Sequence, residues 1–295
     1  MLRAADTIFR TDTGRQRPGN EDNAFARAPL FVVADGMGGA QAGEVASALA
    51  VEEFHQGLPA DGTAEERLAT RIRSANRRVY DKSRAEVELE GMGTTLTAVY
   101  VDADYLAVAH VGDSRAYIFR DGVLSLLTED HSLVGELVRQ GKLTEAQAAE
   151  HPQRSIITRA LGIEADVEVD TWSYPGRVGD VVLLCSDGLT SMIDEERIAA
   201  ILAEERDLSR AADGLIAAAN EAGGRDNITV VLFRLEDAGA DGGHEQPTAV
   251  GLEPVDGADP PGADQRPPAD SGAVMTAPAL SATQRGAAPR LARTQ

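Results

Sequence analysis

The sequence predicts an α+β fold in which antiparallel sheets carry helices on their outer faces. Three observations support this prediction. Apolar runs of strand length follow one another with only turns between them in residues 95–127 and, less densely, 167–185, which is typical of antiparallel strands. Other segments carry apolar residues at helical spacing. The sequence has no strict strand–helix–strand repeat, so it does not favour a doubly wound parallel sheet.

Individual elements follow from local patterns. Apolar residues on one helical face predict helices over 42–54, from 68 to near Gly91, and over 208–219. Asp207 is a suitable N-cap for the third helix, and Thr144 with Gln147 forms a capping box that opens a further short helix. Runs rich in Val, Ile, Leu, Thr and Tyr predict eight strands, over residues 7–11, 30–34, 95–102, 106–111, 116–120, 167–172, 181–185 and 228–235.

The charge balance excludes several classes of partner. The chain of 295 residues has 48 acidic and 28 basic side chains and a net charge of −20. Such a chain is poorly suited to bind a phosphate backbone or an anionic membrane surface. It has no N-terminal signal-peptide pattern, no run near the roughly 20 apolar residues of a membrane span, and a single cysteine, Cys185. We therefore expect a cytoplasmic protein without nucleic-acid or membrane partners.

The composition changes after Leu235. Residues 237–295 contain 8 of the 13 prolines, 8 of the 29 glycines and no aromatic residue. A segment of this composition buries too little apolar surface to offset the entropy lost on ordering. We predict one folded domain over residues 1–236 and a disordered tail rich in Pro, Gly and Ala over 237–295.

Four aspartates stand where an apolar strand meets a turn. They are found in Asp35-Gly36, Gly112-Asp113, Asp187-Gly188 and Asp226-Asn227. Taken singly, each is best explained as a turn dipeptide. As a set they suggest more, because strands of one core can place their ends along one rim. Carboxylates gathered there repel one another, and divalent cations resolve that repulsion. Oxygen ligands with no Cys and few His favour Mg²⁺ or Mn²⁺.

Two such ions, about 3.5–4 Å apart, are a known device for hydrolysing phosphate esters without a protein nucleophile. The sequence contains no G-x-S-x-G pattern, and Cys185 lies within an apolar run, where a core position is the simpler interpretation. The glycine-rich segment 35–39 could cradle a nucleotide phosphate, but the Lys of a P-loop is missing. Arg17 precedes Asn20-Glu21-Asp22 and is of the residue type that grips phosphate, although an isolated Arg is usually a solvated surface group.

Six motifs then occur in a recognisable order. They are Thr11-Asp12-x-Gly14-x-x-Arg17-x-x-Asn20-Glu21-Asp22, Asp35-Gly36-Met37-Gly38-Gly39, Gly93-Thr94-Thr95, Gly112-Asp113-Ser114-Arg115, Ser186-Asp187-Gly188-Leu189 and Gly224-x-Asp226-Asn227. Over residues 5–235 the sequence resembles the metal-dependent serine/threonine protein phosphatases of the 2C type (the PPM family), in their bacterial form. The resemblance implies a four-layer α-β-β-α sandwich with two central antiparallel sheets.

The resemblance also implies a site. Two Mn²⁺ or Mg²⁺ ions would be held by the catalytic residues Asp35, Asp187 and Asp226 together with the Gly36 carbonyl, and Asp35 would bridge the ions. Asp113 with Asp187 would bind a third, weaker ion. Glu21 and Asp22 would hold waters bound to the ions, and Arg17 would bind the substrate phosphate. Residues 129–162 resemble a flap beside the site.

This resemblance predicts a monomeric phosphatase that removes phosphate from phosphoserine and phosphothreonine on proteins and opposes a serine/threonine protein kinase. Animal members of the family carry a histidine, proposed to protonate the leaving oxygen, where this sequence has Met37. That leaves the general acid open. Two alternatives remain: a catalytically silent module that binds phosphoproteins, which would require loss of metal ligands, and a metal-dependent phosphodiesterase acting on small nucleotides.

Overall fold

The computed structural model describes residues 1–38 and 42–239. The last strand ends at Asp237, one residue inside the segment predicted as a tail. The rest of that segment, from residue 240 onward, lies outside the described residues, and its predicted disorder stays a prediction.

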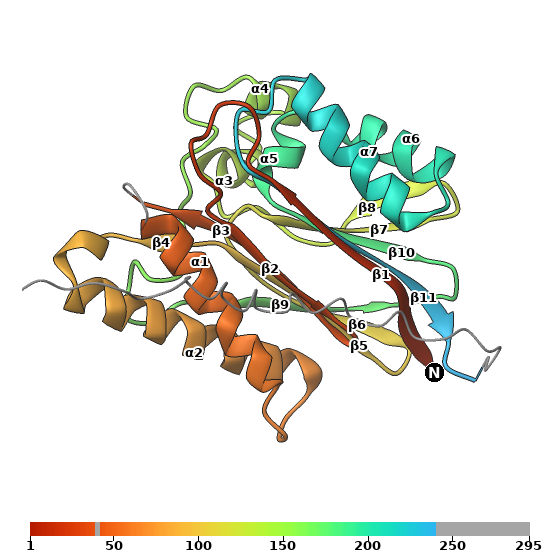
Figure 1. Cartoon of the computed structure of the whole chain (residues 1–295), viewed down its shortest axis with the longest axis horizontal. Coiled ribbons are helices and arrows are strands. Elements are labelled where there is room, and N and C mark those ends of the chain that lie inside the picture. Colours follow the sequence, from red (N-terminus) through yellow and green to blue (C-terminus); the bar gives the residue numbers. More distant parts are fainter. Residues whose placement is uncertain (39–41, 240–295) are drawn as a thin grey trace, which may run out of the picture. The chain divides into compact units, whose positions relative to one another are not determined.

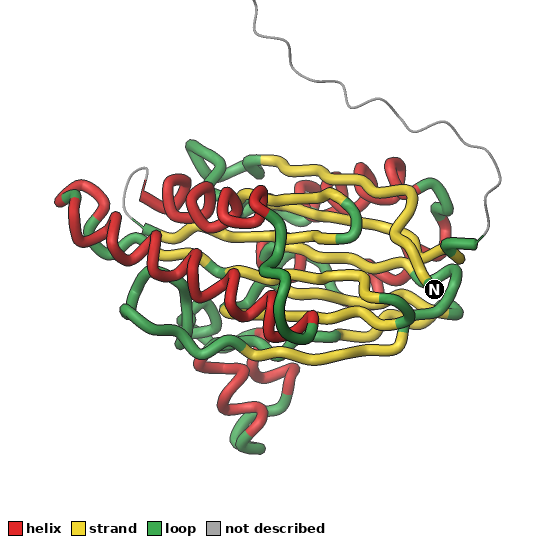
Figure 2. Tube along the Cα trace, turned by 90° about the horizontal axis from the view of Figure 1, so that it is seen from below, coloured by secondary structure: helices red, strands yellow, loops and turns green. Residues whose placement is uncertain are grey.

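Two antiparallel sheets form the centre of the fold. One sheet has the order β1-β11-β10-β7-β8, and the other has the order β2-β3-β5-β6-β9, with the short strand β4 paired to β3. In Figure 2 the strands run in roughly the same direction across the molecule. The bounds of the first sheet are β1 Leu2–Asp12, β11 Ile228–Asp237, β10 Val181–Cys185, β7 Arg115–Arg120 and β8 Val123–Leu126. Those of the second are β2 Asp22–Arg27, β3 Leu30–Met37, β4 Gly93–Thr94, β5 Leu96–Asp102, β6 Tyr105–Val111 and β9 Asp170–Pro175.

Helices cover the outer face of each sheet. The helices α1 (Ala42–Glu52) and α2 (Ala64–Ala85) lie on the sheet that contains β3, whereas α6 (Glu195–Glu204) and α7 (Leu208–Glu221) lie on the sheet that contains β11 (Figure 1). An apolar core lies between the sheets and includes Phe31 stacked on Phe233, with ring centroids 3.9 Å apart. The predicted α+β sandwich of four layers is confirmed.

The chain crosses between sheets more often than the sequence suggests. The strands β5 and β6 pair as neighbours, and so do β7 and β8, but β6 and β7 belong to different sheets, as do β9 and β10. The turn at Gly112-Asp113 is therefore a crossing between the two sheets. This crossing places Asp113 between strand ends of both sheets.

Most predicted elements are found, with shifts at their ends. Asp207 caps α7, and the capping box of Thr144 and Gln147 opens α4 (Glu145–Ala149). The strand predicted over 167–172 begins only at Asp170. Before it, Val167 and Val169 have no regular structure and pack against the apolar core formed by α1, α2 and β3. The predicted helix 42–54 ends at Glu52 and continues as a 3₁₀ turn, Glu53–Gln56. The helix predicted to end near Gly91 ends at Ala85 (α2). Six further elements were not predicted from the sequence: β2, β4, β8, α3 (Leu133–Arg139), α5 (Asp187–Thr190) and α6.

The segment that resembles a flap contains α3 and α4. Two isolated bridges attach its ends: Ser132 pairs with Ile157, and Leu161 pairs with Thr94. No helix within the described ranges is both long enough and apolar enough to cross a lipid bilayer.

Candidate metal and phosphate site

The predicted aspartates come from strand ends that the fold brings together. Asp22 opens β2 and pairs directly with Asp35 near the end of β3. Asp187 follows β10 at the first position of the short helix α5 (Asp187–Thr190), and Asp226 precedes β11, the antiparallel neighbour of β10. The two loops touch, since a Cβ added at Gly188 would lie 1.9 Å from the Asn227 carbonyl oxygen.

Electrostatics show the same convergence. Burial, followed by the charges of Asp22, Asp187, Asp113 and Asp226, raises the pKa of Asp35 well above its ordinary value. Burial also raises the pKa of Asp22 to about 7, that of Asp113 to about 8 and that of Asp187 to about 6. The charge of Asp187 contributes to the first two, and the charge of Asp226 to the third. Carboxyl groups that raise one another's pKa in this way favour binding of a cation.

Several carboxylate oxygens in this cluster are buried and have no hydrogen-bond donor. Within the described residues, Oδ1 of Asp22, of Asp113 and of Asp187 is buried and accepts no hydrogen bond. A buried charged oxygen without a partner is costly, and a hard divalent cation is the ligand that satisfies several of them at once. The donor set therefore fits Mg²⁺ or Mn²⁺ by its chemistry. As the side chains stand, no group of three or more His, Cys, Asp or Glu residues in 1–38 and 42–239 is arranged to hold a metal ion.

Gly36 is held where a larger residue would not fit. A Cβ at this position would lie 2.1 Å from the Gly43 carbonyl oxygen of α1. Its amide donates to the Glu21 carbonyl, 3.2 Å away, and Ser47 donates to the same oxygen over 2.6 Å. Helix α1 therefore packs close to both Glu21 and the Asp35-Gly36 pair. Burial raises the pKa of Glu21 as well.

Arg17 lies on the loop between β1 and β2 and reaches the cluster from the outside. Its guanidinium donates to Oδ2 of Asp226 at 2.7 Å, and 46% of its side chain is exposed. This bond raises the pKa of Arg17. The predicted phosphate-binding group and a predicted metal ligand are thus in direct contact, with Arg17 still open to solvent on one side.

The structure also shows supporting residues to which the sequence analysis gave no role. Ser186 donates from Oγ to Oδ2 of Asp22 at 2.7 Å and accepts from the Thr229 amide at 3.0 Å. Thr95 accepts the Asp35 amide on Oγ1 at 2.9 Å, and Thr94 donates to the Asp35 carbonyl at 2.9 Å. Each of the four lies in or next to a family motif, which was the available signal. Met37 pairs with Gly93 and brings no titratable group to the site.

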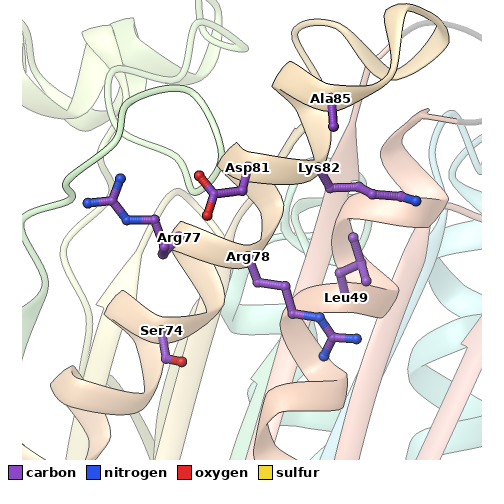
Figure 3. A pocket seen from close by; sticks show the side chains of 7 residues that line it. All are labelled: Leu49, Ser74, Arg77, Arg78, Asp81, Lys82 and Ala85. Carbon is purple, nitrogen blue, oxygen red and sulfur yellow. The ribbon is translucent and has the colours of Figure 1, made fainter.

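An open groove lies away from these residues. It has a volume of about 770 Å³, lies along α1 and α2, and is lined by none of the predicted site residues (Figure 3). Its cations are already engaged: Arg78 pairs with Glu52 and Glu53, and Lys82 pairs with Glu86. We therefore assign no role in the chemistry to this groove.

Comparisons with known proteins show the family of the chain. The family model described as protein phosphatase 2C matches residues 20–225. The serine/threonine phosphatase stp of Listeria monocytogenes serotype 4b is 46% identical over 235 residues, which cover 76% of this chain and 93% of that protein. PstP of Mycobacterium tuberculosis is 41% identical over 245 residues, covering 82% of this chain and 47% of that protein.

Solved structures lead to the same family. The crystal structure of the Mycobacterium tuberculosis phosphatase PstP/Ppp superimposes with a TM-score of 0.75 at 40% identity, covering 80% of this chain and all of that one. A PstP catalytic domain in complex with two manganese ions gives a TM-score of 0.74 at 38% identity, with the same coverage. With a matching family model over more than two thirds of its length and relatives of this similarity, the chain belongs to the protein phosphatase 2C family.

Proposed function

We propose that this chain is a metal-dependent serine/threonine protein phosphatase. The observation that carries the proposal is the convergence of Asp35, Asp113, Asp187 and Asp226, from separate strand ends, around buried carboxylate oxygens without partners, with Arg17 at the edge. The names of the relatives, serine/threonine phosphatase stp and serine/threonine protein phosphatase PstP, support the substrate class. The two manganese ions in the PstP complex support two Mn²⁺ or Mg²⁺ ions as cofactor.

The residues divide into ligands and supports. Asp35, Asp187, Asp226 and the Gly36 carbonyl would hold the two ions, and Asp113 with Asp187 would hold a third. The ions, when bound, lower the pKa of water to supply hydroxide and neutralise phosphoryl oxygens. Asp22 and Glu21 contact these ligands: Asp22 pairs with Asp35 across the two strands, and the backbone carbonyl of Glu21 accepts the Gly36 amide. The four carboxylates are all present, which argues against a silent phosphoprotein-binding module.

The phosphate monoester would be gripped by Arg17. The planar guanidinium can donate to two phosphate oxygens at once, and its exposed side faces solvent. Binding of a cation to Asp226 would weaken that carboxylate's hold on Arg17 and leave the guanidinium for the substrate. Cys185 offers no alternative nucleophile, because burial raises the pKa of its thiol to about 12. Hydrolysis therefore proceeds without a phosphoenzyme in this proposal.

The protein substrates would be those phosphorylated by a serine/threonine kinase of the same cell, in the cytoplasm, and the enzyme would act as a monomer. Substrate choice would involve the flap segment, residues 129–162, because its ends are bridged to strand β4 and to each other beside the site.

Hydrolysis of a phosphoserine peptide by the purified chain tests the proposal. We expect phosphate release in Mn²⁺, none in excess chelator, and none from the Asp35→Asn variant in Mn²⁺. Activity that persists in chelator would overturn the metal mechanism. Faster turnover of a cyclic dinucleotide than of the peptide would favour the phosphodiesterase alternative instead.

A further inference from the structure

The side chain of Asn227 ties the Arg17 loop to the body of the protein. Only 3% of this residue is exposed. Its Nδ2 donates to the carbonyl oxygens of Thr13 at 3.0 Å and Gly19 at 2.8 Å, and its Oδ1 accepts the amide of Glu21 at 2.7 Å. Both amide protons and the amide oxygen are used. Partner chemistry fixes the orientation, since a carbonyl can only accept and a peptide N–H can only donate.

The two carbonyls that Asn227 holds stand on either side of Arg17. Residues 15–18, which lie between them, are exposed. Within this span, Arg15 donates its amide to the Gly224 carbonyl at 2.7 Å, which adds one backbone anchor near the start of the segment. An exposed loop has few contacts of its own to limit its motion. Fixing Thr13 and Gly19 to one buried amide confines the backbone from which Arg17 extends.

The backbone of Asn227 is fixed to the predicted ligands. Its amide donates to Oδ1 of Asp226 at 2.9 Å. Its carbonyl is covered by Gly188, where an added Cβ would lie 1.9 Å from that oxygen. One residue is thus bonded through its backbone to a predicted metal ligand, and through its side chain to the loop that carries the predicted phosphate-binding group.

We infer that Asn227 is a positioning residue that sets the distance between Arg17 and Asp226, and so places the substrate phosphate relative to the metal ligands. The inference rests on the proposed function. In this inference Asn227 acts without contacting the substrate or an ion. Because Asn227 acts through Arg17, its substitution should weaken phosphate binding, which a simple loss of stability would not do.

This effect appears in kinetics with a phosphoserine peptide in Mn²⁺. We expect Asn227→Ala to raise KM and the inhibition constant of inorganic phosphate, with kcat less affected. The loss in kcat/KM should be about tenfold to a hundredfold, as expected for a reacting group displaced by about 1 Å. In an Arg17→Ala background, Asn227→Ala should lower kcat/KM by less than about threefold, because the effects of residues that act through one another do not add.

Asn76 on α2 offers a matched control. It is also buried, at 1% exposure, donates from Nδ2 to the carbonyls of Glu164 and Ala165, and accepts the Gly162 amide on Oδ1. It thus makes the same three bonds, to residues 162–165, which begin at the last residue of the flap segment and do not include the Arg17 loop. We expect Asn76→Ala to lower the melting temperature by about as much as Asn227→Ala does. Its effect on kcat/KM should be the same in the wild-type and the Arg17→Ala backgrounds.

Several outcomes would overturn the inference. One is an Asn227→Ala effect of the same size with and without Arg17. Another is a loss of Mn²⁺ affinity, measured by calorimetry, in step with the loss of kcat/KM, which would make Asn227 a support of the ligands. If Asn227→Ala does not fold, Asn227→Ser, whose hydroxyl can still donate to one carbonyl, is measured in the same cycle. Failure of the wild-type chain to hydrolyse the peptide at all would refute the proposed function instead.

Discussion

Replacing Asp187 by Asn should stabilise the metal-free protein while it removes activity. In the folded chain the pKa of Asp187 is raised from its ordinary value of 3.8 to about 6, chiefly by burial and then by the charge of Asp226. A pKa higher in the folded than in the unfolded state means that ionisation opposes folding. The penalty is absent below pH 4, grows between about pH 4 and pH 6, and is constant above that range.

The magnitude follows from the two pKa values. The difference corresponds to at most about 3 kcal/mol of unfolding free energy above pH 6. For a domain of this size, that is roughly 6–12 °C in melting temperature. Asparagine keeps the shape and can donate to the neighbouring Asp35, so most of this gain should appear.

The assay is thermal unfolding in chelator at pH 5 and at pH 8, with Asp102→Asn, an exposed carboxyl at the end of β5, as control. We expect Asp187→Asn to melt above wild type at pH 8 by more than at pH 5, and the control to match wild type at both. Added Mn²⁺ should raise the melting temperature of wild type more than that of the variant. A variant that melts no higher than wild type at pH 8 would refute the electrostatic reasoning.

Three further predictions concern the phosphate-binding Arg17, the contact between Gly188 and Asn227, and the apolar core. Arg17→Ala should raise the KM for a phosphoserine peptide at least about tenfold while Mn²⁺ affinity, measured by calorimetry, is kept; an unchanged KM would remove Arg17 from the phosphate site. Gly188→Ala should cost about 3 kcal/mol or more in urea unfolding, because its Cβ would meet the Asn227 carbonyl, whereas Gly19→Ala, with open space around it, should be nearly neutral; equal costs would contradict the contact. Leu183→Ala, in the fully buried β10, should lose about 3 kcal/mol in the same assay, and a loss below about 1 kcal/mol would mean that this core is not tightly packed.

The sequence was sufficient for the architecture because the strand and helix patterns are local. The Asp207 cap and the apolar face of α7 appear directly in the spacing. It was insufficient where an element depends on its neighbours. Strand β2 is short and only partly buried, and it exists because Asp22 to Arg27 pair with β3. Helix α6 does have a local signal in the sequence, the Asp194 cap followed by Ile198, Ile201 and Leu202, although it was not predicted.

The site shows the same division. Strand ends followed by Asp and Gly pointed to the aspartates, and the motif order pointed to their grouping. Neither could show that Arg17 contacts Asp226, nor that both protons of the Asn227 amide serve the Arg17 loop. Such contacts join residues more than 200 positions apart and depend on how the loops fold over one another. No local pattern encodes them.

The central claim is that divalent cations hold these carboxylates together. Anomalous scattering from a crystal of the chain grown with Mn²⁺ tests it most directly. We expect two manganese peaks that share Asp35 as a ligand, with Asp187, Asp226 and the Gly36 carbonyl among the other ligands. Peaks located away from Asp35, or a carboxylate cluster without manganese in a preparation that hydrolyses phosphoserine peptide, would contradict it.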